Sequence, residues 1–312
     1  MTLNQQQKKF WLCMNNLNCT FILLLFVAQL AKGQLIENSL SNAFTDDPFF
    51  NTEIVKLNKL RSLHGTIFTK KELSSIKKSG KSQHFKFDKK GNLIQQYSTF
   101  FRKGKRDTTF ILYNYDKKGN LISKRTNDVN GFYSYNFEFN DQNDIIKKTY
   151  CRDINKLNSR SNFILEKQFV VIKEGYSYIK KDTVVIKNVL NNNGLPYQQI
   201  QYTYNALGYL TSEIKKLIIN NKKTTIIYTY NSHGLLASKE ISNSQQKYNI
   251  KKTTFLYDKL GNLIELNYFK NDKHVTHKEI LYDEKTFLLK ALIVQDVETN
   301  FIKIVKFKAS FY

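Results

Sequence analysis

One ten-residue stretch, Tyr113–Ile122, recurs along the chain and limits what the chain can fold into. Tyr113 and Tyr115 stand two positions apart, so they share one face of a strand. The carboxylate of Asp116 can accept hydrogen bonds from backbone N–H groups that follow it, which favours a turn. Gly119 comes where a type I turn closes into a residue with positive φ, a conformation that glycine adopts without steric cost. The stretch therefore predicts a tight β-hairpin.

Further copies carry the same turn chemistry. The first turn residue and the glycine-equivalent residue are Asp88 and Gly91, Asp116 and Gly119, Asn140 and Asn143, Asn205 and Gly208, Asn231 and Gly234, Asp258 and Gly261, and Asp283 with Thr286. Asparagine makes the same local bond as aspartate, and it also tolerates positive φ in place of glycine. The β-branched Thr286 is poorly suited to positive φ, so we predict a different turn there.

The turns recur roughly every 26 residues, a period that indicates a repeat architecture. One longer gap contains the segment 191–194, which predicts an extra turn outside the pattern. Strand segments alternate apolar and polar residues, as antiparallel sheets with one buried face do, and short sequential turns imply a meander. We expect an all-β fold: an antiparallel meander of repeated β-hairpins that forms a long twisted, curled sheet, either an open barrel or a half-shell. Whether the sheet closes stays open.

The region before the repeats predicts a short helix within Phe49–Asn58, capped by Asn51 or Thr52 and with Glu53 in its first turn. A first strand is expected at 60–68 and a loop at 69–82. The expected organisation is a signal peptide at 1–33, an N-terminal arm with the short helix and first strand at 34–82, and a hairpin-repeat domain at 83–312.

The signal peptide is predicted from the apolar run Phe21–Ala31, which is shorter than the about 20 residues that a membrane-spanning helix requires. Small residues precede an expected cleavage before Gln34. The chain should thus be secreted, periplasmic or on the cell surface of a bacterium, and not integral to a membrane. A transmembrane barrel is the rival, disfavoured because lysines stand on the expected exposed faces. Cleavage leaves Cys151 as a single cysteine, which we expect to be buried or reduced.

The turns at 88–92, 116–120 and 258–262 resemble the YD repeat of the RHS/YD-repeat family, in which a tyrosine–aspartate turn is followed by Gly-Asn and an apolar residue. The resemblance covers roughly residues 80–290. It implies a shell built from hairpins, and large members of the family resemble closed shells around a C-terminal toxin. This chain has too few repeats for a large shell, so we expect a short secreted bacterial member without a toxin domain.

The formal net charge of +23 admits an anionic partner such as nucleic acid, lipopolysaccharide or an acidic glycan. However, evolved phosphate sites usually recruit arginine for its bidentate fork, and nearly all the basic residues here are lysines dispersed along the strands. The composition therefore favours a solvated basic face and disfavours a nucleic-acid partner.

No catalytic, cofactor or metal motif stands out in the sequence. His274 and His277 form the one close histidine pair, but positions three apart on a strand face opposite sides. The acidic stretches 127–131 and 140–144 lack the spacing of a calcium loop and fit turn chemistry. The repeated aromatics fit a sheet interior better than exposed stacking platforms. The sequence thus predicts no catalytic residue, no cofactor and no metal.

The sequence favours a non-enzymatic secreted or envelope protein that presents a sheet surface to an envelope protein or glycan. The alternative is an enzyme or small-ligand carrier that uses a cavity within the curled sheet. The residues of the best repeats are expected to form the turns and the core. Any site is therefore expected where the repeat pattern is lost, at 151–195 or near Thr286.

Overall fold

The computed structural model describes residues 50–102, 104–128, 130–157, 159 and 162–312. The predicted signal peptide and its cleavage site lie outside these residues. Within the described part, no helix has the length and apolar character needed to cross a membrane.

The described chain forms one short helix and a single antiparallel sheet of 18 strands. The elements are α2 (Thr52–Leu57), β1 (Leu60–Lys70), β2 (Lys77–Phe87), β3 (Leu93–Arg102), β4 (Lys105–Tyr115), β5 (Leu121–Asp128), β6 (Gly131–Phe139), β7 (Ile145–Asn155), β8 (Leu165–Lys181), β9 (Val184–Leu190), β10 (Pro196–Tyr204), β11 (Leu210–Leu217), β12 (Lys223–Tyr230), β13 (Leu236–Asn243), β14 (Gln246–Tyr257), β15 (Leu263–Lys270), β16 (Lys273–Tyr282), β17 (Leu289–Asp296) and β18 (Ile302–Phe311).

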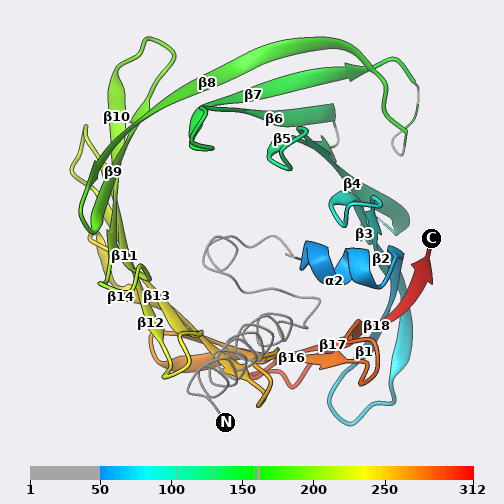
Figure 1. Cartoon of the computed structure of the whole chain (residues 1–312). Helices are drawn as coiled ribbons and strands as arrows, with labels where there is room; N and C mark the ends of the chain where they lie inside the picture. The colour runs from blue at the N-terminus through cyan, green and yellow to red at the C-terminus, as the bar shows by residue number, and fades with distance from the viewer. Residues whose placement is uncertain (1–49, 103, 129, 158, 160–161) are drawn as a thin grey trace, which may run out of the picture.

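Each strand pairs with its neighbour in sequence, and β1 pairs with both β2 and β18. The sheet therefore closes into a barrel, which Figure 1 shows as a ring of strands. The predicted antiparallel meander with a short N-terminal helix is confirmed, and closure answers the question that the sequence left open. The prediction of a loop throughout 69–82 is wrong, because β1 continues to Lys70 and β2 begins at Lys77.

Helix α2 lies inside the ring of strands (Figure 1) and identifies the inward face of the sheet. Its N-cap is Asn51, whose side-chain oxygen accepts hydrogen bonds from the backbone N–H groups of Glu53 and Ile54 at 3.0 and 3.2 Å. Phe50, just before the cap, packs edge-on against Phe85 and Phe87 of β2, with ring centroids 4.9 and 5.0 Å apart. Side chains that share the face of Phe85 around the ring therefore point inward.

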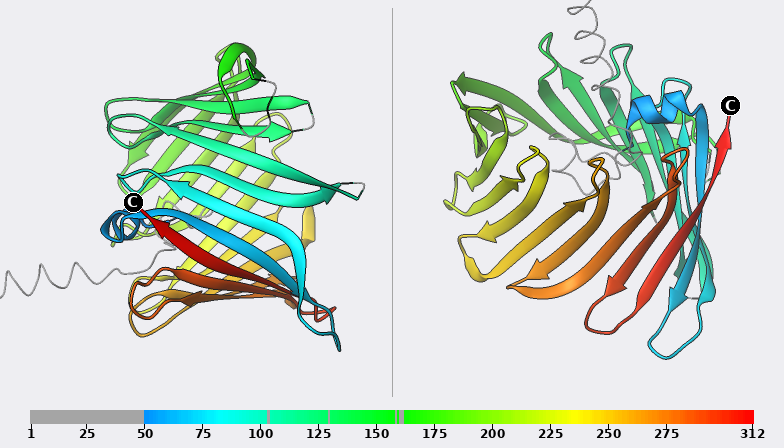
Figure 2. Two further views of the ribbon diagram at one scale, coloured as in Figure 1. Left: turned by 90° about the vertical axis from the view of Figure 1, so that its right-hand side faces the viewer. Right: turned by 60° about the horizontal axis from the view of Figure 1, so that its bottom comes forward.

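The aspartate turns hold their hairpins through side-chain hydrogen bonds. At the first turn, Oδ1 of Asp88 accepts from the backbone N–H groups of Lys90 and Asn92, at 2.8 and 2.9 Å. The side chain of Asn92 donates to the other carboxylate oxygen at 3.0 Å. The turns that begin at Asp116 and Asp258 make the same asparagine bond. These turns lie at one end of the barrel, which we call the turn rim; α2 lies at the same end (Figure 2).

The two degenerate turns differ as their residues suggest. Asn143 adopts φ of 61° at the glycine position. At the last copy, Thr286 does not take positive φ; the turn is longer, and Phe287 takes φ of 53° while its N–H donates to the carbonyl of Asp283. The prediction of a different turn at Thr286 is confirmed. The extra turn at 191–194 is also present, and it lies at the opposite rim, between β9 and β10.

A recurring tyrosine hydrogen bond ties four of the repeats to the turn before them. The hydroxyl of the second tyrosine in the motif donates to the backbone carbonyl that follows the preceding turn. The pairs are Tyr115 with Leu93, Tyr230 with Leu210, Tyr257 with Leu236 and Tyr282 with Leu263, at 2.9, 2.7, 2.9 and 3.0 Å. The turn rim is thus cross-linked from hairpin to hairpin.

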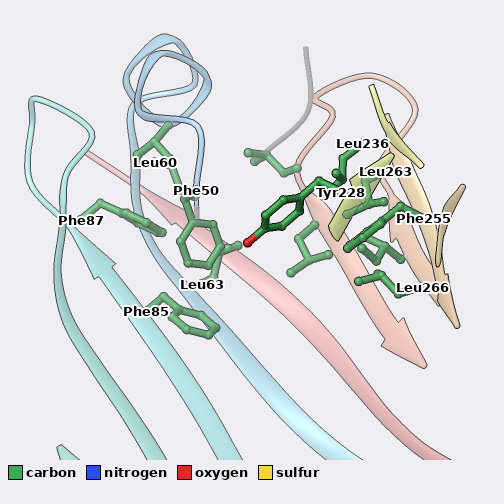
Figure 3. Packing of buried hydrophobic residues seen from close by; sticks show 14 of the residues in the cluster. Phe50, Leu60, Leu63, Phe85, Phe87, Tyr228, Leu236, Phe255, Leu263 and Leu266 are labelled. Atoms are coloured by element: carbon green, nitrogen blue, oxygen red, sulfur yellow. The ribbon is translucent and has the colours of Figure 1, made fainter. Parts of the chain in front are cut away.

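The apolar core covers only part of the inner wall. It joins Phe50 and Val55 to inward residues of β1, β2 and β11–β17, among them Leu63, Phe85, Tyr228, Phe255 and Leu266. Figure 3 shows these side chains pointing toward one another from the two sides of the cluster. We call this part of the inner wall the apolar arc.

Phe163, which precedes β8, packs on part of the outer face of the barrel. Its ring packs on Phe132 and on the guanidinium of Arg125, with centroid distances of 4.8 and 4.2 Å. Beneath it, Nε of Arg125 lies 2.7 Å from a carboxylate oxygen of Asp153, whose side chain is fully buried. Cys151 is free and 1% exposed, so the prediction of a buried thiol is confirmed. Burial raises its pKa.

Two turn glycines should differ in how well they tolerate alanine. A Cβ on Gly119 would meet nothing within 4 Å, so Gly119→Ala should cost only the left-handed backbone, about 1–2 kcal/mol. A Cβ on Gly91 would lie 2.2 Å from the carbonyl oxygen of Thr52 at the start of α2. We expect Gly91→Ala to cost at least about 1 kcal/mol more, because the helix must shift. Urea denaturation measures both, with Gly208→Ala as a control matched to Gly119→Ala; equal losses at 91 and 119 would refute the contact with α2.

Candidate functional site: an inward tyrosine–lysine wall

The inward face of β5–β10 lies outside the apolar arc and carries a different set of side chains. The strand register places Lys148 opposite Phe137 and Glu174, and Tyr178 opposite Lys187. Pairing from Lys187 through Ile200 of β10 and through β11 puts these residues on the same face as Ile226 of the apolar arc, so they point inward. We call this surface the tyrosine–lysine wall. Its members are Asp128, Tyr133, Tyr135, Lys148, Tyr150, Arg152, Glu174, Tyr176, Tyr178 and Lys187.

Three tyrosines form the part of the wall on β6 and β7. The ring centroids of Tyr133, Tyr135 and Tyr150 lie between 5.3 and 6.1 Å apart. Cations lie over two of these rings: Arg152 is 5.6 Å from the ring of Tyr133, and Lys148 is 4.9 Å from that of Tyr135. Such contacts stabilise a cation on an aromatic face while leaving its hydrogen-bond donors available.

A carboxylate lies at the centre of the wall. Glu174 accepts hydrogen bonds from the hydroxyls of Tyr176, at 2.8 Å, and Tyr197, and it lies 3.5 Å from Nζ of Lys148. Burial acts to raise the pKa of Glu174, but the two tyrosine bonds and Lys148 outweigh it, and the pKa is lowered. Glu174 therefore stays ionised at neutral pH and holds the surrounding phenols in place.

Of the cations in the wall, Lys187 has the most strongly shifted pKa. Its ammonium lies 3.6 Å from the ring centroid of Tyr176 and 5.7 Å from that of Tyr178. Burial lowers the pKa of Lys187 to about 8, although the charge of Glu174 acts in the opposite direction. The protein therefore keeps a cation there at neutral pH that it can lose in mild alkali.

Side chains of the wall and of its neighbours on β8 are partly exposed to solvent. The side chains of Lys148 and Glu174 are 35% and 22% exposed. Phe169 and Ile172 of β8, which pair with Arg152 and Tyr150, are 46% and 50% exposed. These values contrast with the apolar arc, where Leu63 is fully buried. The tyrosines of the wall are part-buried and lie outside the apolar core cluster, whereas the sequence pattern had suggested core packing for the repeated aromatics.

The turn residues named from the sequence lie elsewhere. Asp88, Asp116, Asn140, Asn205, Asn231, Asp258 and Asp283 all open turns at the turn rim. The structure does not bring them into the wall. Sequence reasoning did not single out Lys148, Glu174 or Lys187, although the last two fall within 151–195, where a site was expected. The alternation of Glu174, Tyr176 and Tyr178 two residues apart was the available signal.

The expectation that His274 and His277 face opposite sides is wrong. A β-bulge shifts the register between β15 and β16, so His274 pairs with Phe269 and His277 pairs with Asn267 on the same outward face. The two rings lie 6.3 Å apart. Nε2 of His277 is 3.0 Å from a carboxylate oxygen of Glu279. Even so, the described part of the chain holds no group of three or more side chains suited to bind a metal ion.

Comparison with known proteins gives weak structural likeness. No protein-family model and no curated protein matches the chain. A crystal structure of TcdB2-TccC3-TEV is similar over 71% of this chain and 12% of its own, with 15% identity and a TM-score of 0.32. Porin-like proteins from Bacteroides uniformis and Bacteroides vulgatus match 81% and 69% of the chain, and 97% and 96% of their own lengths, with 9% and 10% identity and TM-scores of 0.36 and 0.28.

At these TM-scores the similarities carry no argument about activity, and this chain spans about an eighth of the TcdB2-TccC3-TEV chain. The resemblance to YD repeats therefore stays a prediction from the turn motif. What the barrel does has to be inferred from its own residues.

Removal of the central carboxylate should be visible in the tyrosine titration. Burial and Glu174 raise the pKa of Tyr197 to about 12 and also raise that of Tyr176. In Glu174→Gln the negative charge that opposes phenolate is gone, so both pKa values should fall and more phenolate should form below pH 12. Absorbance of phenolate against pH measures this. Glu138→Gln, an exposed carboxylate paired with Lys147, is the control and should leave the curve unchanged; an unchanged curve for Glu174→Gln would contradict the arrangement.

Proposed function

We propose that this protein is a non-enzymatic envelope barrel that binds an acidic glycan along its tyrosine–lysine wall. The observation that carries the proposal is a connected group of tyrosine rings and cations around Glu174 on one inward face, from Arg152 over Tyr133 to Lys187 over Tyr176. Lysine and arginine attract the carboxylate or sulfate groups of such a glycan. Tyrosine offers a flat apolar ring with a polar hydroxyl, which suits the mixed faces of a sugar.

The chemistry of the wall fits a glycan better than a nucleic acid. Stacking aromatics would also accept bases, but phosphate recognition favours the bidentate fork of arginine. The one arginine of the wall, Arg152, is already bound to Asp128 at 2.7 Å. Glu174 and its tyrosine partners can exchange hydrogen bonds with sugar hydroxyls.

In this proposal, the sheet surface expected from the sequence is the inner face of the closed barrel. The same wall would serve the alternative expected from the sequence, a carrier of small ligands, so the length of the bound glycan distinguishes the two. An envelope location rests on the leader-like run Phe21–Ala31, and export is part of the proposal.

Two adjacent lysines provide the sharpest test. Lys148 faces inward to Glu174, while Lys147 faces outward and pairs with Glu138 in an exposed ion pair. With polygalacturonate as the acidic glycan, we expect Lys148→Met to weaken binding roughly fivefold, the equivalent of about 1 kcal/mol. Lys147→Met should change affinity less than about twofold, as expected for an exposed ion pair. Isothermal titration calorimetry gives both values.

Control ligands test whether binding requires negative charge and a long glycan chain. Uncharged dextran should bind much more weakly than polygalacturonate, and short galacturonate oligomers should bind more weakly than long ones if the wall follows a chain. Equal loss in the Lys147 and Lys148 variants would place binding on the outside of the barrel and overturn the proposal. Stronger binding of single-stranded DNA than of polygalacturonate would do the same.

The lowered pKa of Lys187 predicts a pH dependence with a definite sign. Galacturonate carboxylates remain ionised throughout the range, so the affinity should fall several-fold as pH rises through about 8 and Lys187 loses its proton. Lys187→Arg keeps its charge because the pKa of arginine is above 12, and its affinity should stay nearly flat up to pH 9. The measurement is the affinity of wild type and variant at pH 7 and pH 9. The same decline in both would exclude Lys187 as its source.

A further inference from the structure

A second set of lysines lies in the inner wall, away from the tyrosine–lysine wall. Lys278 of β16 and Lys303 of β18 both pair with Val294 of β17, so they stand in one row on the inward face. One strand, β17, lies between them, and the two inter-strand spacings place their backbones roughly 10 Å apart. Lys81 of β2 is close enough to Lys303 for their charges to repel. The lysines occupy the half of the barrel toward the rim opposite the turns, because Tyr282 and α2 lie at the turn rim.

These lysines lack the carboxylates that balance the cations of the tyrosine–lysine wall. Among the described residues, neither Lys278 nor Lys303 forms an ion pair. The next inward carboxylate along β17, Asp296, instead accepts hydrogen bonds from Thr299 in its turn and faces Lys273. The row therefore carries positive charge without compensation from its neighbours.

Burial makes this arrangement costly for the protein alone. Lys278 and Lys303 are both part-buried. Burial lowers the pKa of Lys278, and the charge of Lys303 lowers it further; the pKa of Lys303 is lowered by burial and by Lys81. An unpaired charge in such surroundings is destabilising unless an opposite charge reaches it.

We propose that Lys278, Lys303 and Lys81 bind a tetrahedral oxyanion, a phosphate or sulfate group, on the inner wall of the barrel. Lysine binds phosphate as a point charge with three donors. Several ammonium groups without a carboxylate among them match a group with more than one negative charge better than a single carboxylate. The site does not depend on the proposed glycan wall, which lies on β5–β10.

Thermal unfolding of the full protein at constant ionic strength tests the site. Inorganic phosphate replacing chloride should raise the Tm of the wild type by a few degrees and saturate with concentration, since a ligand bound only to the folded state stabilises it. Phosphate also stabilises proteins without a site through its exclusion from their surfaces, so matched variants decide the matter.

The double variant Lys278→Met/Lys303→Met should lose the saturable rise, and its Tm in chloride should equal or exceed that of the wild type because the buried repulsion is gone. The control is Lys306→Met/Lys308→Met, which removes the same charge from exposed outward positions and should keep the rise. An equal rise in the wild type and the Lys278/Lys303 double variant would overturn the proposal. Lys148→Met should keep the phosphate response even if glycan binding fails, which separates the two proposals.

The source of the anion is resolved by a second titration. Glucose 6-phosphate and inorganic phosphate are compared by calorimetry on the wild type and the Lys278/Lys303 double variant. Tighter binding of glucose 6-phosphate indicates an oxyanion carried on a sugar, and equal or weaker binding indicates the free anion. Binding of both ligands that is unchanged in the double variant would contradict the site.

Discussion

The rest of the barrel depends on the hydrogen bonds that backbone N–H groups donate to one side-chain oxygen in each motif turn. At Asp116 and its counterparts this bond sets which residues of the two strands stand opposite each other. A one-residue slip in a strand would move every side chain to the other face. Because most hairpins at the turn rim repeat the same bond, corresponding residues of neighbouring strands lie on the same face of the sheet. The tyrosine hydroxyls then join one hairpin to the next.

The uniform register gives the barrel one inner surface with two kinds of lining. In the apolar arc, side chains such as Phe85 and Phe255 belong to one buried cluster that includes Val55 of α2, and this burial contributes the main hydrophobic stabilisation. On the tyrosine–lysine wall, cations are balanced by ring faces and by carboxylates such as Glu174. Around Lys278 and Lys303 that balance is missing. The departures from an apolar interior are where binding is expected, because they are costly unless a ligand completes them.

Local chemistry made the turns, the strand alternation and the helix cap predictable from sequence, since Asp116, Gly119 and Asn51 act on residues within a few positions. Closure was not predictable, because it depends on pairing between Leu60 and Phe311 at the two ends of the described chain. The shared face of His274 and His277 depends on a bulge that periodicity does not reveal. The wall escaped notice for a similar reason: Lys148, Glu174 and Lys187 come together only through cross-strand register.

Tyr312, which follows β18, adds two hydrogen bonds beside the pairing that closes the ring. The backbone N–H of Tyr312 donates to the carbonyl of Lys59, and its hydroxyl donates to the carbonyl of Phe87, beside the first turn. During synthesis the hairpins can form one after another, but β1 keeps an unpaired edge until β18 arrives. An open sheet of this size exposes two edges that can pair with other chains. Pairing of β1 with β18 removes both edges at once, so closure protects the sheet from pairing with other chains.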